Sequence, residues 1–157
     1  MIRGWGPKRA VILVATLWLA IVSSHGCASP TVERKACLGF EVTDTLNLYD
    51  GEPHPLTLFI YPLSSTEGFE ATAADDLLAG ARPAGVIAPP VPITVEPGEA
   101  KRTFQELFPA ETHHLGVIAD YFRAPGEEEG VRRVVVPARC GILKPKVVLE
   151  SRNLEVD

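Results

Sequence analysis

The sequence lacks the short motifs that reveal many enzymes. It contains no Gly-x-Ser-x-Gly nucleophile elbow, no His-Glu-x-x-His zinc motif and no glycine-rich phosphate loop ahead of a helix. His113 and His114 are adjacent, so on a strand their side chains point to opposite faces and cannot hold one metal ion together. We therefore expect a protein that is not an enzyme and that needs no cofactor.

Acidic residues and long apolar runs are also missing from the N-terminal part of the chain. No Asp or Glu precedes Glu33, whereas Arg3, Lys8 and Arg9 give a positive start. The apolar run Ala10–Val22 would be roughly 20 Å long as a helix, short of the roughly 30 Å hydrocarbon core of a bilayer. A positive start, a short apolar middle and small residues at the end are typical of an export signal, here residues 1–26.

Removal of that signal leaves a strongly acidic chain. The whole sequence of 157 residues, enough for one domain, has 15 basic and 20 acidic residues. Three of the basic residues and none of the acidic ones lie in the signal, which leaves 12 against 20, a net charge of −8. Because phosphate backbones repel such a domain, nucleic-acid binding is disfavoured.

Cys27 follows directly after the signal. The four residues that end at Cys27 (SHGC) resemble the lipobox of bacterial lipoproteins, although that family prefers Leu in the place of Ser24. The resemblance implies that the Cys27 thiol is acylated and that the signal is cut in front of it. Ala28 and Ser29 in the next two places resemble outer-membrane sorting. An ordinary signal peptide with an incidental cysteine is the alternative.

The other two cysteines are Cys37 and Cys140. If Cys27 is lipidated, they form an even pair in an oxidising compartment. A bridge between them would close a loop of about 100 residues, worth about 4–5 kcal/mol in the chain-entropy model. Two unpaired cysteines are the alternative, because the sequence does not show whether their Cα atoms come within reach.

Alternating apolar residues predict short strands beyond a polar tether at residues 27–36. Pro62 indicates an edge or a bulge near the end of the second strand, and the segment Lys101–Leu107 returns from the turn Glu96–Glu99. The expected strands are 38–48, 56–63, 93–95, 101–107, 115–122, 131–136, 147–149 and 154–156. Seven or eight strands with regular turn signals predict an all-β domain at residues 37–157, folded as a two-sheet β-sandwich.

One helix is expected within this series of strands. Phe69, Ala73 and Leu77 follow an i, i+4 row in the segment 69–80, and Gly80 suits a C-terminal stop. Asp75 and Asp76 would lie in a first turn or on a solvated face. The acidic run 127–129 is expected to keep a hairpin soluble rather than to bind calcium.

The loop between the first two strands offers aromatic and proline residues on a rigid scaffold, as binding loops often do. A plain hairpin connection is the alternative. The residues of this loop are Tyr49, Asp50, Gly51, Glu52, Pro53 and His54.

An ordered series of segments resembles the TssJ family (also called VasD or SciN) of type VI secretion lipoproteins. The series begins with the lipobox-like cysteine and covers nearly all of the chain after it. Its later members are Leu46-Asn47, Pro55–Leu63, Phe69, Asp76–Leu78, Val95–Glu99, Leu115–Ala119, Phe122-Arg123 and Val147–Val156. Phe59 and Pro62 stand where the family usually has Arg and Gln.

The resemblance implies a transthyretin-like β-sandwich with one short helical insertion. It implies a lipoprotein on the periplasmic face of the outer membrane, which anchors the secretion membrane complex. The partner would be the periplasmic C-terminal part of TssM, and indirectly TssL, with the loop Tyr49–His54 in contact. A transthyretin-like periplasmic module for a small ligand or a cell-wall sugar is the alternative function, and a hydrolase is a third.

Overall fold

The computed structural model describes residues 32–123 and 132–157. Within these ranges, eight strands form two four-stranded sheets, with the orders β4-β1-β7-β8 and β3-β2-β5-β6. The strands are β1 (Glu33–Val42), β2 (Leu56–Leu63), β3 (Val91–Val95), β4 (Lys101–Pro109), β5 (His114–Ala119), β6 (Arg133–Pro137), β7 (Lys146–Leu149) and β8 (Leu154–Val156). Two short helices, α2 (Glu67–Ala71) and α3 (Ala74–Leu78), follow β2. The predicted two-sheet sandwich is confirmed.

The main core lies between the two sheets. β1 contributes Leu38 and Phe40 from the first sheet, and β2 and β5 contribute Leu58, Ile60 and Val117 from the second. All five side chains are at most 2% exposed. Every pairing is antiparallel except that of β1 with β7, which is parallel. The residues Thr31–Asp157 form one compact unit around this core.

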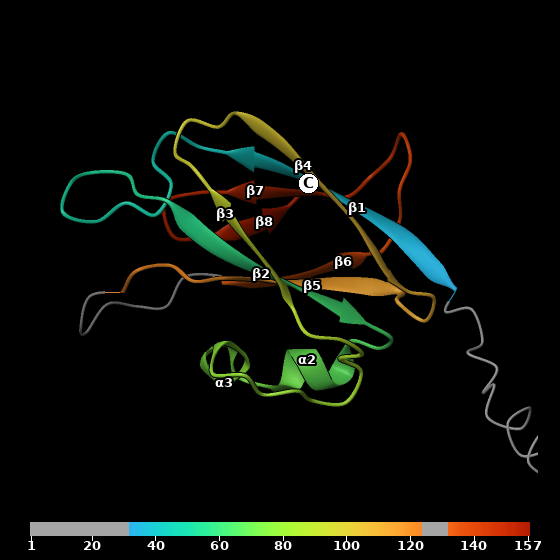
Figure 1. Ribbon diagram of the computed structural model, residues 1–157. Helices are drawn as coiled ribbons and strands as arrows, with labels where there is room; N and C mark the ends of the chain where they lie inside the picture. The colour runs from blue at the N-terminus through green and yellow to red at the C-terminus, as the bar shows by residue number, and fades with distance from the viewer. Residues whose placement is uncertain (1–31, 124–131) are drawn as a thin grey trace, which may run out of the picture. The chain divides into compact units, whose positions relative to one another are not determined.

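A second, smaller cluster covers the other face of β2 and β5. Tyr61, Leu63 and Ile118 point away from the main core and contact Phe69 of α2 and Leu77 of α3. Figure 1 shows both helices packed on the far side of β2 and β5 from β1. The Tyr61 hydroxyl donates to the Leu77 carbonyl at 2.9 Å, and burial raises the Tyr61 pKa. β2 and β5 are therefore apolar on both faces.

Gly116 gives the Phe69 ring its place on the sheet. A Cβ at this position would lie 2.5 Å from the tip of that ring, closer than real contacts allow. The ring itself is fully buried, and burial of a phenylalanine side chain contributes about 2–3 kcal/mol. Gly116 has a low strand propensity, but its missing side chain leaves the space in which Phe69 packs the helical segment on β5.

The expected single helix is wrong, because the chain breaks at Thr72 into α2 and α3. Thr72 is extended, with φ −89° and ψ 135°. Arg133 of β6 donates to the carbonyls of Phe69 and Thr72, which occupies the C-terminal end of α2 with a side chain from a distant strand. The stop at Gly80 is confirmed, since Gly80 has φ +100° and follows the last turn of α3.

Several strand boundaries and one strand pairing also differ from expectation. β1 begins at Glu33, inside the segment assigned to the tether, and ends at Val42, so that Leu46 lies in a turn. The expected return of 101–107 beside β3 is wrong, because β4 crosses to the other sheet and pairs with β1. β5 ends at Ala119 rather than at Phe122.

The edge predicted near Pro62 holds on one side only, because β2 is a central strand that still pairs with β5 at Pro62. β3 pairs with β2 only as far as Ile60, so Pro62 faces no strand on that side. Its carbonyl there accepts the Ile87 N–H at 3.1 Å. The missing proline N–H therefore costs no ladder bond, although β2 is a central strand.

Candidate functional site

The loop between β1 and β2 ends in a tight two-residue turn. The Tyr49 and Glu52 backbones exchange both hydrogen bonds, with N–O distances of 3.1 and 3.0 Å. The two residues between them, Asp50 and Gly51, have φ values of 52° and 81°. Two positive φ values at an Asp-Gly pair make a type I′ turn, the geometry that matches the twist of a hairpin. The predicted binding loop is therefore a small, preorganised hairpin.

Asn47 fixes the base of this hairpin. It is 7% exposed and has φ 48°, a left-handed conformation that Asn tolerates better than most residues. Its Nδ2 donates to the Pro55 carbonyl at 3.0 Å, and its Oδ1 accepts the Phe122 N–H at 2.9 Å. The side chain thus ties the hairpin to the segment after β5. The sequence showed Asn47 as part of the family resemblance and as a turn-forming residue at the end of an expected strand, but not as the residue that joins these segments.

Three aromatic rings meet at the hairpin. The rings of Tyr49 and His54 stack with centroids 3.5 Å apart and an interplanar angle of 13°. Phe122, which is 48% exposed, contacts the Tyr49 ring at a centroid distance of 4.3 Å. We call Tyr49, His54 and Phe122 the aromatic cluster. The cluster joins the predicted loop to Phe122, which lies 68 positions after His54. The sequence of the loop did not reveal this contact.

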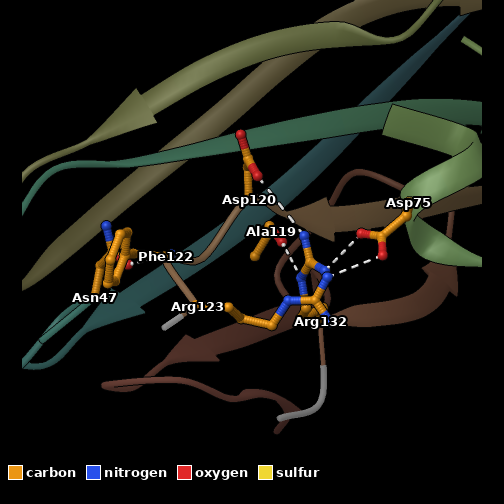
Figure 2. A network of polar contacts seen from close by, with 7 residues as sticks. All are labelled: Asn47, Asp75, Ala119, Asp120, Phe122, Arg123 and Arg132. Atoms are coloured by element: carbon orange, nitrogen blue, oxygen red, sulfur yellow. Dashed lines mark hydrogen bonds and ion pairs between the residues drawn. The ribbon is translucent and has the colours of Figure 1, made fainter. Parts of the chain in front are cut away.

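A network of charges lines the same cleft as Tyr49 and Phe122, and Figure 2 shows it together with Phe122. The Asp75 carboxylate accepts hydrogen bonds from Arg132 at 2.8 Å and from Arg123 at 2.9 Å. Arg132 also donates through Nε to the Ala119 carbonyl and lies 3.7 Å from Asp120. Its side chain is only 4% exposed, whereas those of Asp75 and Asp120 are more than half exposed. The buried arginine is thus held between two carboxylates that face the solvent.

The arginines lower the pKa of Asp75 below the ordinary value of an aspartate. The hydrogen bond from Arg132 is the main cause and that from Arg123 the second. Asp75 occupies the first turn of α3, as expected for an acidic residue at the N-terminal end of a helix dipole. The sequence predicted this place for Asp75 but not its arginine partners.

Two rings of the aromatic cluster, those of Tyr49 and Phe122, and the charged residues line one shallow cleft of about 440 Å³. Asn47, Tyr49 and Phe122 form one side, and Asp75 and Arg132 are among the residues of the other. Within the described ranges, no cluster of three or more His, Cys, Asp or Glu side chains could hold a metal ion. The cleft has the chemistry of a docking surface, with aromatic rings flanked by paired charges.

The other described residues that the sequence singled out do not line this cleft. Cys37 and Cys140 form a disulfide with Cα atoms 4.8 Å apart, which joins β1 to the segment after β6. His114 begins β5, and its Nδ1 is buried without a hydrogen-bond partner among the described residues. Cys27 and the acidic run 127–129 lie outside the described residues. No helix in the described part of the chain is both long and apolar enough to cross a bilayer.

A family model matches residues 34–150, and its description is that of the type VI secretion lipoproteins VasD, EvfM and TssJ. The chain belongs to this family. The predicted resemblance is therefore confirmed, and the family is one of secretion-system lipoproteins rather than of enzymes. No curated protein matches the chain in a sequence comparison.

Solved structures share the fold of this TssJ-family chain at low sequence identity. The lipoprotein TssJ1 from Pseudomonas aeruginosa superposes with a TM-score of 0.65 and 19% identity, over 80% of this chain and 96% of that one. Lip from Serratia marcescens, a membrane-bound component of the secretion system, superposes with a TM-score of 0.65 and 16% identity, over 80% of this chain and 97% of that one. A chain in the structure named for the TssM C-terminal domain from EAEC superposes with a TM-score of 0.65 and 17% identity, over 80% of this chain and 98% of that one.

Proposed function

We propose that this TssJ-family protein anchors the type VI secretion membrane complex by binding the periplasmic C-terminal part of TssM. The observation that carries the proposal is the aromatic cluster on its preorganised hairpin. Tyr49 and His54 are already stacked, and the turn beneath them is closed by two backbone bonds. A surface that is ordered before binding loses little entropy when a partner docks, and aromatic residues dominate binding energy at interfaces.

The direction of β1 supports an anchor with two separate ends. The strand has ten residues, and at about 3.3 Å per residue it spans roughly 30 Å. The chain enters the domain at Glu33, and the hairpin follows the other end of the strand, beyond Val42. We infer that acylated Cys27 holds the first end at the outer membrane, while the hairpin presents the aromatic cluster to TssM. TssL would join indirectly, through TssM.

The solved relatives supply the partner in this proposal. A chain with this fold occurs in the structure named for the TssM C-terminal domain, and another occurs in a structure named the type VI membrane complex. The alternative, a module for a small ligand, has no observation in its favour. The cleft is shallow, and its arginines are engaged by Asp75, whereas ligand sites are mostly apolar and enclosing.

Binding of the soluble domain, residues 28–157, to the periplasmic part of the cognate TssM tests the interface. Tyr49→Ser combined with His54→Ser should weaken binding about thirtyfold or more, the effect of losing an interface hot spot. Leu107→Ser is the matched control, because Leu107 is 55% exposed on β4 and lies opposite Lys35 near the start of β1, whereas the hairpin follows the other end of that strand. No binding of the unaltered domain at about 50 μM, far weaker than a standard interface, would refute the function.

Two further variants separate the parts of the proposal. Replacement of residues 50–54 by a Gly/Ser linker should weaken TssM binding, because the loop would no longer be ordered before the partner docks. An unchanged affinity would refute this interface but not the assignment to the family. Cys27→Ser in the full chain should abolish lipid labelling in cells. Membrane attachment that persists without any label would refute acylation as the anchor.

A further inference from the structure

The loop between β6 and β7, residues 138–145, carries two unusually exposed aliphatic side chains. Ile142 is fully exposed, at 102% of its reference area, and Leu143 is 79% exposed. The other large hydrophobic residues on the described surface are less exposed, with Val32 next at 70%. Single exposed hydrophobics are normal on protein surfaces, but two in succession at a loop tip mark a contact surface.

The base of this loop is fixed, so the exposed tip is held away from the core. The Cys37–Cys140 disulfide joins it to β1. The Cys37 and Gly39 N–H groups donate to the carbonyls of Arg139 and Pro145, at 3.3 and 2.9 Å. Pro145 is buried next to the strand. Ile142 and Leu143 therefore stand on a braced segment between two attachment points.

Basic residues flank the apolar tip in the sequence. Residues 139–146 include Arg139, Lys144 and Lys146 and no acidic residue, in a domain that carries a net charge of −8 after residue 26. Lys144 donates to the Thr103 hydroxyl at 2.9 Å, and Lys146 pairs with Asp157 at 3.0 Å. The ammonium groups thus lie at the base of the tip. An apolar tip with a basic base matches a membrane interface, where aliphatic groups enter the acyl region and cations meet phosphates.

The tether brings this part of the domain close to lipid, a step that rests on the proposed acylation of Cys27. Val32 lies five residues after Cys27, a distance of at most about 18 Å along an extended chain. The loop is attached at Cys37, which lies four residues into β1 from Glu33, or about 13 Å. In Figure 1 the loop lies on the same side as the start of β1, and the hairpin lies on the opposite side.

We propose that the loop 138–145 is a second membrane contact, which inserts Ile142 and Leu143 into the interface of a phospholipid bilayer. One acyl tether alone allows the domain to rotate freely at the surface. Two attachments fix its orientation, with β1 leading away from the lipid and the aromatic cluster directed into the periplasm.

A tryptophan reporter tests the contact in the soluble domain, residues 28–157, which has no acyl group. Both tryptophans of the chain, Trp5 and Trp18, lie before residue 27, so Ile142→Trp provides a single tryptophan. Phe122→Trp is the matched control at the hairpin end, where the side chain is 48% exposed. Vesicles of phosphatidylethanolamine and phosphatidylglycerol, with and without brominated acyl chains, are the probe. The emission of the Ile142→Trp variant should shift to the blue and be quenched by the brominated lipid, whereas that of the Phe122→Trp variant should not respond.

Loss of the aliphatic side chains gives the second measurement. Ile142→Ser with Leu143→Ser should lower vesicle partitioning about tenfold or more, because each side chain contributes separately to burial in lipid. Both positions are exposed, so the thermal unfolding midpoint should not change. High salt should weaken the binding, and vesicles of phosphatidylcholine alone should bind less.

The proposal is overturned if the Ile142→Trp variant is not quenched, or if the Phe122→Trp variant is quenched to the same extent. An Ile142→Trp variant that ignores vesicles but responds to the TssM part, or to added copies of the domain, would identify a protein contact in place of lipid. Failure here leaves TssM binding untouched, since that is measured at the hairpin without lipid. Failure of TssM binding likewise leaves the vesicle result intact.

Discussion

The two ends of the sandwich fix their loops by different means. At the hairpin end, one polar side chain, Asn47, and a stack of rings hold residues 47–55 in place. At the other end, a disulfide and two backbone bonds hold residues 138–145. The rings of the aromatic cluster contact one another, whereas the side chains of Ile142 and Leu143 are 102% and 79% exposed.

The difference suggests what each end contacts. Rings that are already stacked and flanked by paired charges present a defined shape, which suits a folded protein partner. The exposed aliphatic side chains of Ile142 and Leu143, with basic residues on either side in the sequence, present no defined shape, which suits a fluid bilayer. The domain thus has a surface of defined shape beyond the end of β1, whereas the apolar loop tip is attached near the middle of that strand.

The largest expected effect comes from the covalent brace. Cys37→Ser with Cys140→Ser should lower the free energy of unfolding by about 4–5 kcal/mol, because the disulfide closes a loop of about 100 residues in the unfolded chain. Urea unfolding of the oxidised domain measures the loss. Amide exchange should rise first at Cys37 and Gly39 and later at Glu52. A loss below about 1 kcal/mol would show that the brace contributes little in this fold.

Asn47→Ala should have an intermediate effect, about 2–3 kcal/mol. The substitution leaves the Phe122 N–H without its acceptor. It also places alanine at φ 48°, a left-handed conformation that alanine tolerates less well than asparagine. Asn47→Gly is the matched control, because it removes the same bonds but accepts the positive φ, and it should cost about 1 kcal/mol less. Thermal unfolding and the exchange rate of the Phe122 amide report the change. Equal losses for both variants would assign the whole effect to the hydrogen bonds.

The smallest effect is the pH dependence of the charge network. The hydrogen bonds from Arg132 and Arg123 lower the pKa of folded Asp75 below its unfolded value. Its contribution to stability is therefore present above about pH 4, and it is lost as the pH falls through the folded pKa. Asp75→Asn should be less stable than the unaltered domain at pH 7, and the gap should close in acid. The gap should be small because the carboxylate is 60% exposed, and a gap that is constant with pH would contradict the assignment.

Much of the fold was predictable because strand patterns are local. The bounds 56–63 of β2 agree with the structure, and so do the inward faces of Leu115, Val117 and Ala119. The stop at Gly80 was likewise predictable, from a single residue that favours positive φ. Partners in space were not predictable. At the break, the Thr72 carbonyl is bound by Arg133, a residue 61 positions later, and β4 does not pair with β3 but with β1.

The candidate site shows the same division. The turn at Asp50-Gly51 and the aromatic content of the loop were readable from adjacent residues, because turn chemistry is local. Phe122, Asn47 and Arg132 entered the site only through folding. Nothing near Arg132 in the sequence marks it as a buried cation bound by a carboxylate of α3.

By itself, the sequence determined the acidic β domain, the family and the positions of most strands, because alternation and turn residues act over a few positions. The tertiary structure decided which strands are neighbours, which cysteines meet and which side chains form the cleft. These depend on contacts between segments far apart in the chain, where hydrogen-bond geometry and packing choose among pairings that local patterns leave open.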